Sequence, residues 1–185
     1  MKFRCSTTWA ILWIAAFLFV MIADCKGLLC NKGLKIMDGE YYRVFTGLLL
    51  HVNWFHLLFN IIAIYFVCEY LEKIAGLSPL KLLMFSALVG TIANFIFSAI
   101  YTESTSVGGS PVVFALIGLI CVLQICYRDL PRFQLGTWYG NWTLAAAILG
   151  NIPIFSENIS TLVVHGISFL IAVVLGLIAT GLKLF

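Results

Sequence analysis

The chain has 185 residues, of which 62% are hydrophobic and 10% charged, with a net charge of +3 at pH 7 and a mean hydropathy of +1.06. Because soluble domains carry roughly 25% charged residues, this composition excludes a water-soluble globular protein. The small positive charge reflects membrane orientation and does not indicate nucleic-acid binding. We expect a chain whose solvent is the lipid bilayer.

Six stretches longer than eighteen residues contain no Asp, Glu, Lys or Arg. They cover residues 5–23, 44–68, 82–102, 104–127, 133–156 and 158–182. As helices, each is long enough to cross a hydrocarbon core of about 30 Å. Their apolar character on all sides is typical of helices and not of barrel strands, which alternate apolar and polar positions. The sequence therefore predicts an all-α membrane protein, a compact six-helix transmembrane bundle that forms a single domain over residues 1–185.

The distribution of Lys and Arg predicts the orientation of this bundle. With the N-terminus in the cytoplasm, seven of these cations lie inside and four outside, which favours an N-in, C-in topology. All four outer cations lie in the first outer loop, 24–43. The alternative for the first span is a cleaved leader, but its apolar run is longer than usual and no A-x-A site follows.

The six cysteines and the histidines give no metal motif. Cys25 and Cys30 lie on the outer loop, where both a disulfide and two free thiols remain open. The other four cysteines lie in or beside spans and are interpreted as apolar filler. Three histidines on two spans do not form a closed site, so neither a metal nor another cofactor is expected.

All three histidines lie within the predicted spans. His51 and His56 belong to the second span and His165 to the sixth. Ionisable groups are costly in hydrocarbon, so each is a candidate functional residue. Asn60 follows His56 by four positions and therefore shares its helix face. The alternative is that these groups only join helices through hydrogen bonds.

The fourth span begins with a short polar segment that carries a candidate nucleophile. Gly108 and Gly109 permit a close backbone approach, and Pro111 suits the first turn of a helix. Ser110 should therefore lie at a helix N-terminus, where backbone N–H groups can hold a developing negative charge. Taken alone, Ser110 is better interpreted as the cap of this helix.

Depth in the membrane links Ser110 to His165. Spans two, four and six all run from outside to inside, and Ser110 and His165 lie six and seven residues past the starts of their runs. Both should thus be about 10 Å below the outer boundary. A serine and a histidine at matched depth can form a nucleophile and base pair. His56 and Asn60 lie within reach of the same level.

These residues together resemble the rhomboid intramembrane serine proteases over residues 37–176. The motifs that carry the resemblance are Glu40-Tyr41-Tyr42-Arg43, His51, His56 and Asn60 in H-x4-H-x3-N, Glu72-Lys73-Ile74-Ala75-Gly76, Gly108-Gly109-Ser110, Phe114, and His165 with Ser168 and Ala172. Two departures are that Pro111 stands where active members usually have Gly, and that Ser168 and Ala172 replace glycines of the sixth span.

The resemblance implies a serine endopeptidase that cleaves transmembrane segments of membrane proteins near the outer face of the bilayer. Ser110 would attack the peptide carbonyl, with His165 as general base and no third carboxylate member. The oxyanion would be held by His56, Asn60 and the Ser110 N–H. Phe114 would pack on the His165 ring, and His51 would order the entrance to the second helix.

The same resemblance gives a role to the outer loop, and the residues of helix five lead to a separate hypothesis for that helix. Glu40 and Arg43 would fix the loop, which would lie half in the outer leaflet. Helix five, 141–155, would be weakened by Asn151 and Pro153 and would act as a lateral gate beside helix two.

Two other functional classes remain. An inactive relative that binds transmembrane helices would be consistent with Pro111, and a channel would use the same polar layer as a pore. Below Asn60 the inward runs hold no amide or ionisable side chain of the kind a pore would need except Gln124, which favours a closed floor. The short core suggests a prokaryotic cytoplasmic membrane.

Overall fold

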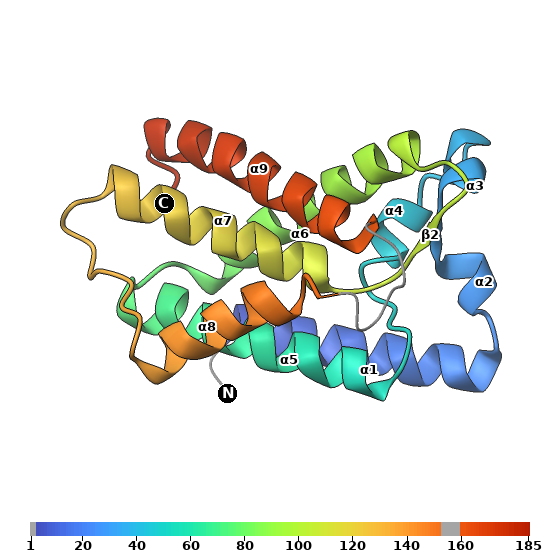
Figure 1. Cartoon of the computed structure of the whole chain (residues 1–185), viewed down its shortest axis with the longest axis horizontal. Coiled ribbons are helices and arrows are strands. Elements are labelled where there is room, and N and C mark those ends of the chain that lie inside the picture. Colours follow the sequence, from blue (N-terminus) through green and yellow to red (C-terminus); the bar gives the residue numbers. More distant parts are fainter. Residues whose placement is uncertain (1–2, 153–159) are drawn as a thin grey trace.

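The structure, a computed structural model, describes residues 3–152 and 160–185. In chain order its elements are α1 (Cys5–Ala23), α2 (Lys26–Leu29), β1 (Asn31–Lys32), α3 (Gly33–Met37), α4 (Arg43–Thr46), α5 (Trp54–Cys68), the π-helix η1 (Glu69–Ile74), α6 (Pro79–Ile100), β2 (Thr105–Ser106), α7 (Ser110–Cys126), α8 (Trp138–Leu149) and α9 (Ser160–Gly181). The long helices form a bundle, and the short elements α2, α3 and α4 gather at one end of it (Figure 1).

Four helices of the described chain are long and apolar enough to cross a membrane. They are Cys5–Ala23, Trp54–Ile74, Pro79–Ile100 and Ser160–Gly181. The apolar helix α7 is shorter, with 17 residues, and α8 has 12 residues. The expectation of a helical membrane bundle is therefore confirmed, while the count of six spans and the N-in topology stay predictions.

Two predicted spans have different bounds in the structure. Residues 44–68 are not one helix, because the Asn53 side chain caps α5 by accepting a hydrogen bond from the His56 N–H at 2.9 Å. Helix α5 therefore starts at Trp54, and the prediction that His51 belongs to this helix is wrong, since His51 precedes it. At the C-terminal end of α5 the helical turns continue through η1, although this segment carries charged residues that ended the charge-free run.

The predicted fifth span, 133–156, is also shorter in the structure. The Thr137 side chain caps the start of α8, and Gly150 follows its last residue. The helix predicted over 141–155 thus ends before Asn151 and is not interrupted by it. Pro153 lies outside the described residues.

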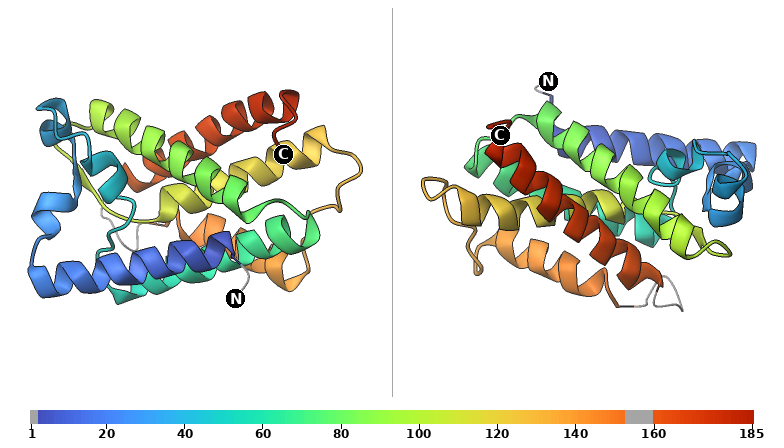
Figure 2. Two further views of the ribbon diagram at one scale, coloured as in Figure 1. Left: turned by 180° about the vertical axis from the view of Figure 1, so that it is seen from behind. Right: turned by 90° about the horizontal axis from the view of Figure 1, so that it is seen from above.

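Helix α7 lies at the centre of the bundle, with α6 and α9 on one side and α1, α5 and α8 on the other (Figures 1 and 2). Its closest partner is α9, because small residues line their contact: a Cβ on Gly118 would lie 2.8 Å from the Phe169 carbonyl oxygen and 2.9 Å from the Ala172 Cβ. Ser168 and Ala172 are fully buried there. The small residues that follow His165 therefore permit close helix packing, as expected.

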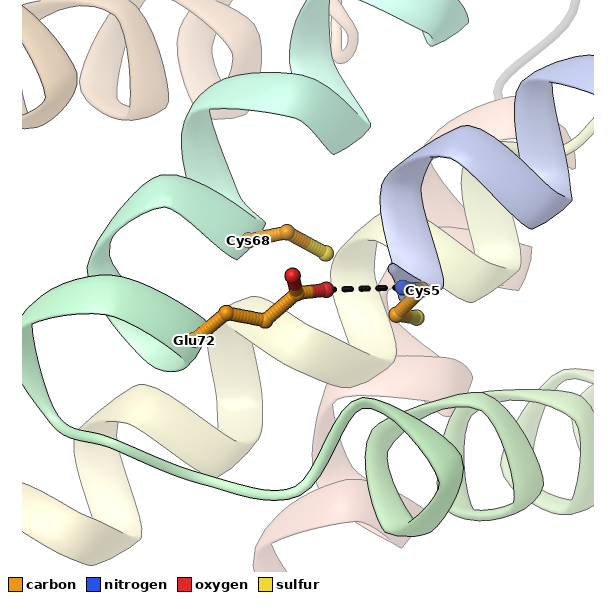
Figure 3. A group of neighbouring side chains, drawn as sticks. All are labelled: Cys5, Cys68 and Glu72. Atoms are coloured by element: carbon orange, nitrogen blue, oxygen red, sulfur yellow. Dashed lines mark hydrogen bonds between the residues drawn. The ribbon is translucent and has the colours of Figure 1, made fainter. Parts of the chain in front are cut away.

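The start of α1 is fixed by an acidic residue of η1. The Glu72 Oε1 atom accepts a hydrogen bond from the Cys5 N–H at 2.8 Å (Figure 3). The first N–H groups of a helix lack partners within the helix, so a carboxylate stabilises this end. Glu72 therefore ties η1, which continues α5, to the start of α1.

The outer loop 24–43 is organised around the buried guanidinium of Arg43, whose residue is only 3% exposed. This group makes an ion pair with Glu40 at 2.6 Å and donates hydrogen bonds to the carbonyl oxygens of Gly27 and Cys30. The hydrogen bond and charge of Arg43 lower the pKa of the Glu40 carboxyl from its usual value. The internal bonds expected of Glu40 and Arg43 are confirmed. Cys25 and Cys30 are both free thiols.

This folded loop reaches the segment that leads to Ser110. Strand β1 pairs antiparallel with β2, with Asn31 opposite Ser106 and Lys32 opposite Thr105. The Asn31 side chain also bonds to α6, since its Oδ1 accepts a hydrogen bond from the Ser98 hydroxyl at 2.7 Å. The loop, α6 and the segment that leads to α7 are thus connected by hydrogen bonds. A loop that only contacts solvent would lack these bonds.

Candidate active site

Ser110 and His165 are hydrogen-bonded to each other. The distance from His165 Nε2 to Ser110 Oγ is 2.7 Å, although the residues are 55 positions apart in the sequence. His165 lies in the second turn of α9 and is 2% exposed. The two side chains that the sequence pairs are thus in contact, while their depth in a membrane stays a prediction.

Ser110 is the first residue of α7, and Gly109 occupies the N-cap position. Its hydroxyl bonds to His165 and does not cap the helix, which answers the alternative left open by the sequence. The N–H groups of the first helical residues have no partner within the helix, and this holds for Ser110 in α7. Pro111 has no N–H, so at this position the helix loses no hydrogen bond. Pro111 is therefore compatible with the helix start.

Phe114, one turn after Ser110, stacks on the imidazole ring of His165. The ring centroids are 4.1 Å apart and the planes differ by 11°. The expected packing of Phe114 on this ring is present. It restricts the plane of the imidazole ring beside Ser110.

A cavity of about 180 Å³ opens at this pair. His56, Asn60, Ser110 and His165 all line it, together with apolar side chains that include Phe59 and Val164. Asn60 donates one amide hydrogen to the His56 carbonyl oxygen at 3.0 Å, and each amide NH₂ has a second hydrogen. The structure thus brings the four candidate residues of the reaction centre to one cavity.

The two glycines before Ser110 are required by close contacts. Gly108 has a φ of +148°, and a Cβ there would lie 2.8 Å from the His56 ring. A Cβ on Gly109 would lie 2.2 Å from the Trp13 ring. Residue 108 is also anchored by its N–H, which donates to the Gly47 carbonyl oxygen at 3.0 Å. The glycines let the chain pass between these two rings.

His51 supports this passage from the segment that precedes α5. Its Nε2 accepts a hydrogen bond from the Gly109 N–H at 3.4 Å, and its ring makes edge contacts with Trp13 and His56. His51 is therefore placed to order the entrance of α7, whereas the resemblance assigned it to the entrance of helix two. It is not among the residues that line the cavity at Ser110.

One neighbour of His165 is not predicted by the sequence as part of the site. The Asn151 Oδ1 atom lies 3.0 Å from His165 Nδ1, on the side of the imidazole opposite Ser110. The sequence indicated Asn151 only as a helix breaker. The signal that could have found it is depth, because Asn151 lies a few residues from the predicted outer end of the fifth charge-free run and so near the level predicted for Ser110 and His165.

A separate group of metal-ligand side chains lies at the other end of α5. Donor atoms of Cys5, Cys68 and Glu72 are within 4.8 Å of one another, and zinc accepts such donors. Glu72 is engaged there in holding the start of α1 (Figure 3). None of the three lines the cavity at Ser110.

Comparison with known proteins places the chain in a family. The family model of the Rhomboid domain matches residues 38–182. The chain belongs to the rhomboid family. It is 30% identical over 103 residues to the rhomboid protease GluP of Bacillus subtilis (strain 168), a match that covers 55% of this chain and 20% of that protein.

A second relative from the same organism and strain is YdcA, a candidate rhomboid protease by its name. It is 29% identical over 97 residues, which cover 52% of this chain and 47% of YdcA. The matched segments thus span about a fifth and about half of these curated relatives. As a rhomboid family member with several apolar helices, the chain is a multi-pass membrane protein.

Proposed function

We propose that this protein is an intramembrane serine endopeptidase that cleaves transmembrane segments of membrane proteins. The observation that carries the proposal is the 2.7 Å contact between His165 Nε2 and Ser110 Oγ at a cavity inside an apolar bundle. The relatives named as rhomboid proteases support the same reaction class. The proposed setting is a six-span, N-in and C-in bundle in a prokaryotic cytoplasmic membrane.

In the proposed reaction His165 takes the proton of Ser110 while Oγ attacks the substrate carbonyl carbon. The tetrahedral oxyanion is held by the Ser110 N–H and by the side chains of His56 and Asn60. His165 then gives its proton to the leaving amine, which breaks the C–N bond and leaves an acyl-enzyme. Water attacks this ester by the same route and releases the second product.

The outer loop and α8 would serve substrate entry. In this proposal Glu40 and Arg43 keep the loop folded beside the outer leaflet, and α8 moves away from α5 to admit a substrate helix. Contacts between these helices include Phe66 against Trp142, with ring centroids 5.3 Å apart, and Phe66 against Trp138. Both contacts would have to separate for α8 to move away from α5 in this way.

The second candidate is a catalytically inactive protein that binds transmembrane helices, and Pro111 is the observation that favours it. An assay of single-span substrate cleavage in liposomes distinguishes the protease from the inactive helix-binding protein. The variants to compare are Ser110→Ala and His165→Ala. We expect the unmodified protein to cleave and both folded variants to be inert. If the unmodified protein only retains the substrate and Pro111→Gly restores cleavage, the inactive class is correct.

A further inference from the structure

Asn151 contacts His165 from the turn that follows α8. Its backbone N–H donates to the Ile148 carbonyl oxygen at 3.1 Å, which holds the residue close to the helix end. Its side chain makes two contacts: Nδ2 with the Ala147 carbonyl oxygen at 2.8 Å, and Oδ1 with His165 Nδ1 at 3.0 Å. The amide thus joins α8 to the side of His165 that faces away from Ser110.

The contact with Ala147 determines which way the amide points. A carbonyl oxygen can only accept, so the Asn151 atom beside it must be the NH₂ group. The atom beside His165 is then the amide oxygen, which also can only accept. His165 Nδ1 must therefore carry the hydrogen of this bond.

This hydrogen fixes the state of the other ring nitrogen. In a neutral imidazole only one nitrogen is protonated, so a hydrogen on Nδ1 leaves Nε2 with a free lone pair. Nε2 then accepts the hydrogen bond from the Ser110 hydroxyl. This is the tautomer that a general base needs, because a protonated Nε2 could not take the serine proton.

We propose that Asn151 is a positioning residue that holds His165 in the Nδ1–H tautomer and orients its ring toward Ser110. The inference rests on the proposed protease function for its catalytic consequence. Phe114 restricts the ring plane by stacking, but a flat aromatic face cannot select a tautomer. The two contacts are therefore complementary: Phe114 sets the plane, and Asn151 sets the proton and the rotation within that plane.

The placement of Asn151 also couples the proposed base to α8. The residue comes directly after Gly150, the C-cap of α8. A displacement of this end of α8 would carry the amide oxygen away from Nδ1. The base is thus fully prepared only when α8 is seated against the bundle, so the chemical step follows substrate entry and reclosure.

The test uses the full-length protein, ¹⁵N-labelled at histidine, in detergent micelles. The chain has three histidines, so His51 and His56 variants suffice to assign the His165 signals. Protonated and bare ring nitrogens have well-separated ¹⁵N shifts, which report the tautomer without reference to activity. Asn151→Leu removes the acceptor at similar volume, and Asn151→Asp keeps an oxygen acceptor. Asn141→Leu is the matched control, because the Asn141 side chain accepts from the Gly136 N–H at the start of α8, away from His165.

We expect Nδ1–H at His165 in the unmodified protein and in Asn141→Leu and Asn151→Asp. In Asn151→Leu we expect this state to be lost, with kcat lowered by about 10- to 100-fold and KM changed by less than about twofold, as for other groups that orient a functional histidine. An Asn151→Leu protein that retains Nδ1–H overturns the proposal, whether or not cleavage falls. So does an unmodified protein with the proton on Nε2. If the unmodified protein shows Nδ1–H but never cleaves, the protease proposal fails while the tautomer readout still decides the role of Asn151.

Discussion

The Ser168 hydroxyl donates a hydrogen bond to the carbonyl oxygen of Pro111. These two residues are departures from the family's usual glycines, and they contact each other across the α7 and α9 interface. Pro111 removes an N–H that a first helical turn does not use, and its buried carbonyl receives a partner from Ser168. The two departures are therefore structurally matched, which supports a helix start that remains intact beside Ser110.

Removing this hydrogen bond should destabilise the helix pair. In Ser168→Ala the Pro111 carbonyl keeps its bond within α7 but loses this second, buried hydrogen bond, at a cost of about 0.5–1.5 kcal/mol in the free energy of unfolding. In Ser168→Leu the larger side chain cannot fit between α7 and α9, so the loss should be greater. Thermal unfolding in detergent measures both. Equal stability of Ser168→Ala and the unmodified protein would show that the contact contributes nothing.

The passage between Trp13 and His56 should tolerate no side chain at residues 108 and 109. Gly109→Ala places a methyl group 2.2 Å from the Trp13 ring, and Gly108→Ala adds an unfavourable φ of +148°. We expect each variant to lose at least about 10-fold in cleavage and to be less stable, since overpacking costs about 1–3 kcal/mol.

Gly166→Ala is the control for this pair, because nothing lies within 4 Å of a Cβ at Gly166 although it follows His165 directly. That variant should fold and cleave normally. Wild-type cleavage by Gly109→Ala would mean that the ring of Trp13 can move aside and that the glycine is not required.

Loss of the stacked ring at Phe114 should slow the chemical step. Aromatic pairs contribute about 0.5–1.5 kcal/mol beyond their buried area, so Phe114→Leu should lower kcat by about 2- to 10-fold. Phe114→Tyr keeps an aromatic face and should retain most activity. Steady-state kinetics in liposomes distinguishes this from a binding defect, which would appear in KM. A normal kcat for Phe114→Leu would remove Phe114 from the positioning of His165.

The outer loop should lose protection against proteolysis at low pH. The pKa of the Glu40 carboxyl is lowered in the folded loop, first of all by its hydrogen bond with Arg43. Its contribution to loop stability is then complete above the unfolded pKa and is lost as pH falls through the lower folded value. Limited proteolysis of residues 24–43, from neutral pH down through the acid range where carboxyl groups titrate, measures this. In Glu40→Gln the loop should be less protected at neutral pH, and its protection should vary less with pH.

The gate proposal predicts that tying α5 to α8 stops cleavage. Cysteines at Phe66 and Trp142, whose rings stack at 5.3 Å, can be joined by a short bis-maleimide in a background that lacks the six native cysteines. We expect cleavage of a bilayer-embedded substrate to fall at least about 10-fold on crosslinking, as when closure controls turnover. The uncrosslinked double variant is the control. Full cleavage by the crosslinked protein would argue against movement of α8.

The amino-acid sequence alone determined the class of the protein and singled out Ser110 and His165 as a candidate pair. Charge-free runs predict membrane helices because hydrocarbon excludes ions, and a constant helical rise converts position into depth. For this reason the positions of Ser110 and His165 within their runs are enough to match them. The glycines before Ser110 likewise indicated a close backbone approach. They did not indicate that the rings of Trp13 and His56 require it.

Only the tertiary structure determined the helix bounds and the contacts between helices. The Asn53 cap makes α5 begin inside the charge-free run 44–68, although this run has the length of one span. At the other end η1 continues the helical turns through charged residues. The hydrogen bond that His165 donates to Asn151 depends on where α8 ends and how that end meets α9. Contacts of this kind arise from the packing of segments distant in sequence, and periodicity or hydropathy along one segment carries no information about them.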